Sequence, residues 1–291
     1  MPGVRKASHA GSWYEGVQTK LSRSIKDWMR LAQADIEPEA SLKAIIGPHA
    51  GYSYCGAVMA HAYAGIDPAS VRRVFLLGPS HHVYTTKCML SPNSVYGTPL
   101  GDIPIDAQVY DELKATGKFA TARASDDEEE HSLEMHCPFL AERLKEQDFT
   151  LVPIIVGATS PSSEEEYGRI LRPYLEEPGT LFVVSSDFCH WGSRFQYTRY
   201  DPKEGPIYKS IEALDRAGME AIETGDPAVF HQYLAKTQNT ICGRHPICIL
   251  LQALKGSSLQ AQINFTSYAQ SSACDSPSGS SVSYASALIT V

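Results

Sequence analysis

The chain has no apolar run long enough to cross a bilayer, and no hydrophobic stretch follows the basic residues at its N-terminus. We therefore expect a cytoplasmic protein with no membrane insertion and no secretory signal. Basic residues are also in the minority, with 25 Lys and Arg against 33 Asp and Glu and a formal charge of −8. Nucleic-acid-binding proteins normally carry a basic surface, so this balance argues against a nucleic-acid partner.

Paired cysteines are missing as well. The seven cysteines are odd in number and form no CxxC pair, which favours reduced thiols over a disulfide framework. The sequence also contains no GxGxxG, GxxxxGK[ST] or GxSxG motif. Dinucleotide-binding, P-loop and α/β-hydrolase chemistry therefore have no motif support.

What the chain does contain is a series of continuous apolar runs at residues 42–47, 73–78, 149–157 and 180–187. Runs of this kind are typical of strands buried on both faces. Segments with helical spacing lie between them, for example Leu21, Ile25 and Met29 on one face. Strands alternating with helices predict an α/β/α sandwich with a largely parallel or mixed central sheet. We expect one domain over residues 1–291.

Three of the predicted strands are followed closely by a histidine. His49 follows the first, His81 and His82 follow the second, and Asp187 and His190 follow the fourth. A single loop histidine is most often hydrogen-bonded or solvated. Since parallel strands end at the same edge of a sheet, where α/β proteins bind ligands, three such histidines predict a common site. Adjacent residues tend to point to different sides, so we favour His81 as a ligand and His82 as a support or loop residue.

Another candidate is Cys242, in the segment "TICGRHPICIL". It precedes a predicted helix whose dipole favours the thiolate, a good metal ligand and a possible redox group. The alternative is a small buried residue in a turn. Cys248 reads as a core residue, and His245 either supports a ligand or bonds locally.

Weaker features surround these. The segment "EEEHSLEMHCP" places His131 and Glu134 at a spacing of three, which puts them on one helical face. It is not the HExxH motif, and a solvated helix start is the simpler interpretation. Residues 133–144 carry a helical stripe of apolar side chains. Trp13 lies beside glycines as a core residue or as the wall of a pocket.

Several motifs together resemble the MEMO family, mediators of receptor-tyrosine-kinase-driven cell motility. The resemblance runs in order through "ASHAGSWY", "PHAGYSYCG", "LGPSHH", "EHSLEMHCPFL", "FVVSSDFCHWG", "TICGRHPI", "SYAQSS" and "SVSYASALITV". It extends from about residue 7 to the C-terminus. The family is similar in fold to class III extradiol dioxygenases, which hold Fe(II) with two histidines and a carboxylate.

The resemblance implies one iron or copper ion per chain, with His49, His81 and Cys242 as ligands. Cys242 occupies the place of the carboxylate, which makes ring-cleaving dioxygenase activity doubtful, because a thiolate is softer and can itself be oxidised. His190 matches the dioxygenase acid–base histidine, and Asp187 would orient it or contact a ligand.

The implied function is a metal-binding redox protein in cell-motility signalling downstream of receptor tyrosine kinases, and the question of enzymatic activity stays open. The alternative is a catalytically inactive adaptor that binds phosphotyrosine peptides in the former dioxygenase cleft, with Trp13, His82 and His190 as contacts. A metal-dependent hydrolase or true dioxygenase ranks below both. Implied partners are phosphotyrosine-containing receptor tails and cytoskeletal regulators, and the nucleus is a second expected location.

Overall fold

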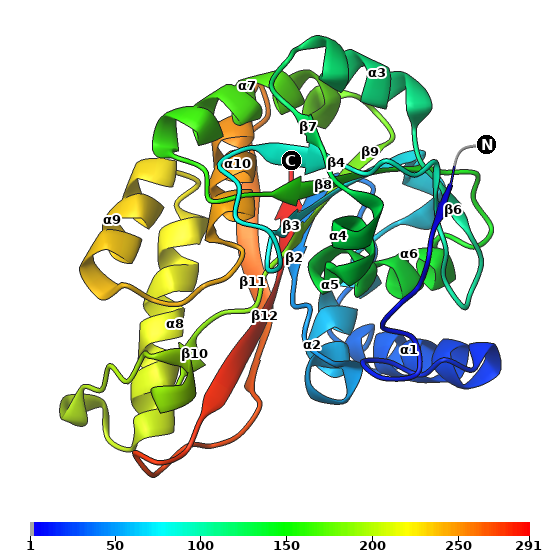
Figure 1. Ribbon diagram of the computed structural model, residues 1–291. Coiled ribbons are helices and arrows are strands. Elements are labelled where there is room, and N and C mark those ends of the chain that lie inside the picture. Colours follow the sequence, from blue (N-terminus) through cyan, green and yellow to red (C-terminus); the bar gives the residue numbers. More distant parts are fainter. Residues whose placement is uncertain (1–2) are drawn as a thin grey trace.

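A nine-stranded mixed sheet runs through the centre of the protein in the computed structural model, which describes residues 3–291 (Figure 1). Its path is β10–β12–β2–β9–β3–β8–β4–β7, and β11 pairs with β12. The strands are β2 (Leu42–Gly47), β3 (Arg73–Pro79), β4 (Cys88–Leu90), β7 (Ala120–Thr121), β8 (Thr150–Val156), β9 (Thr180–Ser185), β10 (His190–Trp191), β11 (Gln262–Gln270) and β12 (Ser281–Thr290). A small second sheet joins β1 (Val4–Arg5), β5 (Val95–Tyr96) and β6 (Ile103–Pro104).

The four predicted apolar strands form the middle of the large sheet. Strands β2, β9, β3 and β8 are mutually parallel, while β12 and β4 join them antiparallel. Nearly every residue of these four strands is buried, as expected for strands covered on both faces. The predicted α/β sandwich with a mixed central sheet is confirmed.

Helices cover both faces of this sheet. They are α1 (Gln18–Ala32), α2 (Tyr52–Ala64), α3 (Ala107–Ala115), α4 (Ala124–Glu129), α5 (His131–Glu134), α6 (Cys137–Arg143), α7 (Pro161–Glu176), α8 (Ile207–Glu223), α9 (Pro227–Thr237) and α10 (Arg244–Lys255). Helix α2 packs on β12 and β2 with α1 outside it, whereas α10 packs on β3 and β9 with α7 against it. Figure 1 shows these two groups on opposite sides of the strands.

Helix α1 follows its sequence pattern. Leu21, Ile25 and Met29 are buried along one stripe, as their spacing predicts. The expected helix over residues 133–144 is instead broken into α5 and α6 at Met135 and His136. Pro138 explains the break, because it has no N–H to continue the hydrogen bonding of α5 and is suited to the first turn of a new helix.

All seven cysteines are unpaired, as expected, and six of them are buried. Within residues 3–291 no helix is both long and apolar enough to cross a membrane.

Candidate metal centre and cavity

Three parallel strands deliver polar residues to one edge of the sheet. His49, His81 and Asp187 each lie two residues beyond the last residue of β2, β3 and β9. Since these strands run in the same direction and pair in register, their exits are neighbours. The structure therefore brings together the strand exits that sequence patterning singled out.

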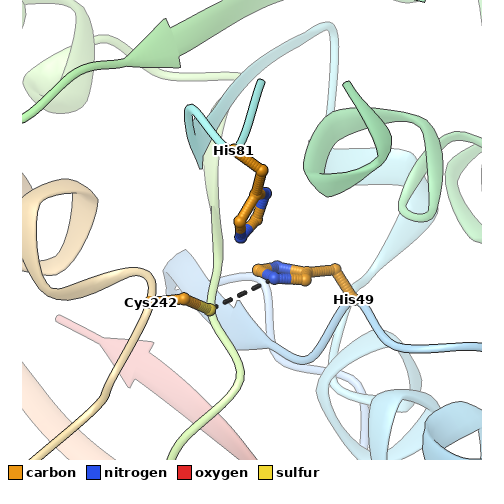
Figure 2. A group of neighbouring side chains, drawn as sticks. All are labelled: His49, His81 and Cys242. Carbon is orange, nitrogen blue, oxygen red and sulfur yellow. Dashed lines mark hydrogen bonds between the residues drawn. The ribbon is translucent and has the colours of Figure 1, made fainter. Parts of the chain in front are cut away.

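The loop before α10 adds Cys242 to this edge. Its Sγ lies 3.2 Å from Nε2 of His49, and the sulfur and one nitrogen of each of His49 and His81 all lie within 4.8 Å of one another. Figure 2 shows both imidazole rings directed toward the space beside the sulfur. The arrangement offers two nitrogens and one sulfur to a common point.

The orientation of His49 is set by a serine at the end of β9. The hydroxyl of Ser185 donates to the carbonyl oxygen of Ser132 at 2.7 Å. Its single proton is thus used, and its oxygen accepts from Nδ1–H of His49 at 2.6 Å. Burial, reinforced by the charge of His81, holds the pKa of His49 well below its usual value. His49 is therefore neutral, with the lone pair of Nε2 directed at Cys242.

A buried carboxylate orients His81. Glu130 accepts from both the backbone N–H and Nδ1 of His81, at 2.6 and 2.9 Å. Burial lowers the pKa of His81, but hydrogen bonds with Cys242 and Glu130 outweigh it and raise that pKa to about 10. In turn, burial alone would raise the pKa of Glu130, yet the hydrogen bond and charge of His81 lower it to about 2. Nε2 of His81 is left facing the sulfur.

The thiol of Cys242 departs from the sequence expectation. The dipole of the following helix was expected to favour the thiolate, but burial dominates and raises the thiol pKa, with only partial compensation from the hydrogen bond of His81. The sulfur also accepts from the backbone N–H of Asp187 at 3.2 Å. Without a cation, the thiol is the favoured form.

Asp187 and His190 lie beside this centre but do not bond to each other. The carboxylate of Asp187 accepts from the backbone N–H of His49 at 2.9 Å, so it positions the loop after β2. Nδ1 of His190 faces the carbonyl oxygens of Phe188 and Thr240, at 2.9 and 3.2 Å. Since both partners are acceptors, Nδ1 carries the proton and Nε2 is the free acceptor. Two carbonyls, rather than Asp187, orient His190.

His49, His81, Asp187 and His190 line a cavity of about 650 Å³. Its wall comprises Trp13, His49, Ala50, Gly51, Tyr54, His81, His131, Asp187, His190, Arg194, Phe195, Ser271, Ser272, Ser280, Ser281, Val282 and Tyr284. Trp13 is thus a wall residue, with its ring 4.5 Å from that of His131. His82 is exposed and is not among the described residues that line the cavity. Its contact with a ligand stays a prediction.

The acidic segment before α6 is largely buried, contrary to the expectation of a solvated helix start, although Glu129 is exposed. Glu130 and Glu134 are only 2% and 1% exposed. Arg5 of β1 donates to Glu134, to the carbonyl of Glu130 and to two further carbonyls of this segment. His131 borders the cavity, and burial together with the charge of His81 lowers its pKa to about 3.

Comparison with known proteins identifies the family of the chain. A family model described as "Memo-like protein" matches residues 5–288. The chain belongs to the Memo family. Among Memo relatives, it is 51% identical to Protein MEMO1 of Danio rerio and 49% identical to Protein MEMO1 of Homo sapiens, in both cases over 99% of this chain and 97% of the relative. It is 46% identical to the Protein memo-1 homolog of Caenorhabditis elegans, over 99% of this chain and 83% of the relative.

A solved structure is similar in fold to this chain at low sequence identity. The crystal structure of an uncharacterized protein, JW3007 from Escherichia coli K12, aligns with a TM-score of 0.50 and 16% identity, over 83% of this chain and 98% of that one. At this identity the likeness concerns the fold alone.

Sequence reasoning missed several residues that shape the centre and the cavity. Glu130 and Ser185 orient the two histidines, and Arg194 brings a positive charge to the wall. A carboxylate next to His131 was visible in the sequence, but nothing in its spacing linked it to His81. The hydroxyl of Ser185 ends an apolar strand, which was the one available signal. His245 lies elsewhere, bonded to Glu164 at 2.7 Å.

Proposed function

We propose that this Memo-family protein binds one iron or copper ion through His49, His81 and Cys242 and acts as a redox protein. The observation that carries the proposal is the convergence of three donor atoms within 4.8 Å. The orientation of the histidines supports it, because Ser185 and Glu130 occupy both Nδ1 atoms and leave both Nε2 atoms for the centre. Such supporting hydrogen bonds are usual around metal-binding histidines.

The donor set fits the proposed ions. Two imidazoles and a thiolate suit copper, zinc and iron more than hard cations such as magnesium, which prefer oxygen. Bound iron or copper would supply one-electron redox chemistry at the wall of the cavity. The chain itself contributes the ligands, the removal of water by burial of His49, and His190 as a proton acceptor facing the same space. The thiolate in place of a carboxylate argues against ring cleavage.

Metal analysis tests this proposal. Protein purified without oxygen should hold iron or copper near one equivalent, and His49→Ala or Cys242→Ala should abolish it. His82→Ala is the matched control, since it removes a neighbouring imidazole that does not line the cavity. Unchanged iron and copper content in both ligand variants would refute the proposal. Reversible oxidation and reduction of the bound ion, followed by electron paramagnetic resonance, tests the redox part.

A second candidate is an adaptor that binds phosphotyrosine peptides in the cavity. Arg194 and several serine hydroxyls line it beside the aromatic wall of Trp13. Arginine recognises phosphate, and an aromatic wall suits a phenyl ring. Chelated, metal-free protein should then bind a phosphorylated peptide more tightly than its unphosphorylated form, and His190→Ala or Trp13→Ala should weaken binding. Absence of any peptide affinity in the metal-free protein would exclude this candidate.

Membership of the Memo family also suggests a cellular role. We propose a role in cell-motility signalling downstream of receptor tyrosine kinases, in the cytoplasm and also in the nucleus, with receptor tails and cytoskeletal regulators as partners. Rescue of migration in cells lacking the protein tests this. If the His49→Ala variant restores migration as well as the wild type does, the metal centre is not needed for the role.

A further inference from the structure

A second cavity lies among α7, α9 and α10, with a volume of about 410 Å³. It shares no described lining residue with the larger cavity. Its wall carries four residues with metal-binding side chains: Glu164, His231, His245 and Cys248. None of them takes part in the centre around His49.

Three helices bring these side chains together. Glu164 stands in the first turn of α7, His231 in α9 and Cys248 in α10. Nε2 of His231 lies 2.8 Å from Oε2 of Glu164 and 3.1 Å from Sγ of Cys248. One oxygen, one nitrogen and one sulfur therefore meet within 4.8 Å of one another. Glu164 lies 67 positions before His231 in the sequence, and His231 lies 17 before Cys248.

The fourth residue holds the carboxylate in place. His245 precedes Cys248 by three residues, so both face the same side of α10. Its Nδ1 lies 2.7 Å from the other carboxylate oxygen, Oε1 of Glu164. This contact leaves Oε2 directed toward His231 and Cys248. Histidines that orient a ligating carboxylate in this way are common beside metal ions.

Because Glu164 is buried, a positive charge close to its carboxylate would stabilise this cluster. Its side chain is 2% exposed, and buried carboxylates are normally paired. Among residues 3–291 its ion-pair partners are His231 and His245, which are charged only when protonated. Arg244 lines the same cavity but lies beyond ion-pair distance of Glu164. A divalent cation would supply the missing charge at any pH at which the ligands are deprotonated.

We propose that Glu164, His231 and Cys248 bind a zinc ion, with a fourth position open to the cavity. Mixed oxygen, nitrogen and sulfur ligands favour zinc over calcium or magnesium, and three protein ligands plus an open position are typical of zinc sites that bind a further group. Bond lengths of about 2.0–2.3 Å place tetrahedral ligand atoms roughly 3.4 Å apart. The present separations of 2.8 and 3.1 Å must open by a few tenths of an ångström.

The structure allows this adjustment. His231 is 28% exposed at its side chain, so its ring can shift toward the cavity without repacking the core. When the ion binds, the thiol proton of Cys248 leaves to solvent, and the proton that Nε2 of His231 donates to Glu164 moves to Nδ1 of the same ring or to solvent. Cys248 itself is fixed in α10 and buried, which keeps the sulfur in place.

Zinc titration of the full chain tests the proposal. The first centre is removed by the double substitution His49→Ala and Cys242→Ala, and zinc is then titrated against a chromophoric chelator. We expect one equivalent to bind, and a further His231→Ala substitution to weaken the apparent affinity at least about tenfold. His61→Ala is the matched control, since His61 lies in α2 and away from this cluster.

Cobalt gives a second measurement that reports the sulfur. Co²⁺ bound in place of zinc should produce a thiolate charge-transfer absorption that Cys248→Ser abolishes and Cys274→Ser keeps. Should Cys248→Ser fail to fold in thermal melting, the partly exposed His231→Ala variant decides alone. No zinc on the double variant, or zinc affinity unaffected by His231→Ala, would overturn the proposal. Iron or copper content of the single His231→Ala variant reports separately on the first centre.

Discussion

Replacing Arg5 by methionine is expected to remove a large part of the protein's folding free energy. The guanidinium is fully buried, and all five of its N–H donors are used. Its acceptors are the carboxylate of Glu134 and the carbonyl oxygens of Lys6, Asp127, Glu128 and Glu130. Methionine has similar length but no donors, so the substitution removes charge and hydrogen bonds without opening a large cavity.

The size of the stability loss follows from the buried groups that would lose their partner. Glu134 is 1% exposed and would keep a buried charge without its guanidinium partner, although it would still accept from His9 and Tyr14; breaking a buried ion pair typically costs about 3–5 kcal/mol. Each carbonyl left without a donor adds on the order of 1 kcal/mol unless water reaches it. We therefore expect a loss of about 5 kcal/mol, which approaches the whole stability of many domains. Because Arg5 also fixes the backbone of Glu130, the support of His81 should loosen with it.

Urea denaturation at pH 7, followed by circular dichroism, measures this loss. The double variant Arg5→Met with Glu134→Gln removes the stranded charge, so its loss should be smaller than the sum of the single losses by about 1–3 kcal/mol. Arg169→Met is the surface control, because that side chain is 65% exposed and should change stability by less than about 0.5 kcal/mol. A loss below about 1 kcal/mol for Arg5→Met, or strict additivity in the double variant, would refute the reasoning.

Three further predictions concern the cavity and the acid-sensitive network. A Cβ at Gly243 would overlap the carbonyl oxygen of Ser185, so Gly243→Ala should lower the stability of the fold by at least about 1–3 kcal/mol, measured by thermal melting. Gly51→Ala is the control and should change the stability little, because the nearest atom to its added Cβ is 3.5 Å away. Equal melting temperatures for the two variants would contradict this prediction. Burial would raise the pKa of Glu134, but hydrogen bonds and the adjacent guanidinium lower it to about 2. A carboxyl group whose pKa is lowered on folding stabilises the fold at pH values above its ordinary pKa near 4.5, and this stabilisation is lost as the pH falls through 2. The difference in unfolding free energy between wild type and Glu134→Gln should therefore shrink between pH 4.5 and pH 2 in urea titrations. A difference that stays constant over this pH range would contradict the prediction. Ser185→Ala removes the acceptor of His49 Nδ1 and should weaken metal affinity about 10–100-fold in chelator competition, and unchanged affinity would show that the serine does not orient the ring.

The larger elements could be predicted because their patterns are long. Four apolar runs became β2, β3, β8 and β9, and the stripe of Leu21 and Ile25 became α1. Strands of two or three residues, such as β7 and β10, carry too little periodicity to be recognised. The helix expected over residues 133–144 failed at Pro138, where a local backbone rule outweighed the apolar pattern.

The candidate site was predictable only where its residues lie next to a recognisable strand. His49 and His81 follow recognisable strands, so parallel pairing was enough to place them at one edge. Glu130 was read as solvated, since an acidic run is normally exposed. It is buried because its carboxylate accepts from His81 and its backbone carbonyl accepts from Arg5, 125 residues away. No sequence spacing connects partners that lie so far apart along the chain, so their contact could not be predicted from the sequence.

The sequence by itself determined the strand–helix alternation, the strand exits that carry the histidines, and the Memo-family motifs. These depend on local periodicity and on residue order, which a single chain displays directly. Tertiary structure decided which nitrogen of each histidine faces Cys242, why that thiol stays protonated, and that Glu164, His231 and Cys248 meet. These features depend on how segments far apart in the sequence pack together in three dimensions, because packing determines hydrogen-bond partners, burial and the convergence of separate helices.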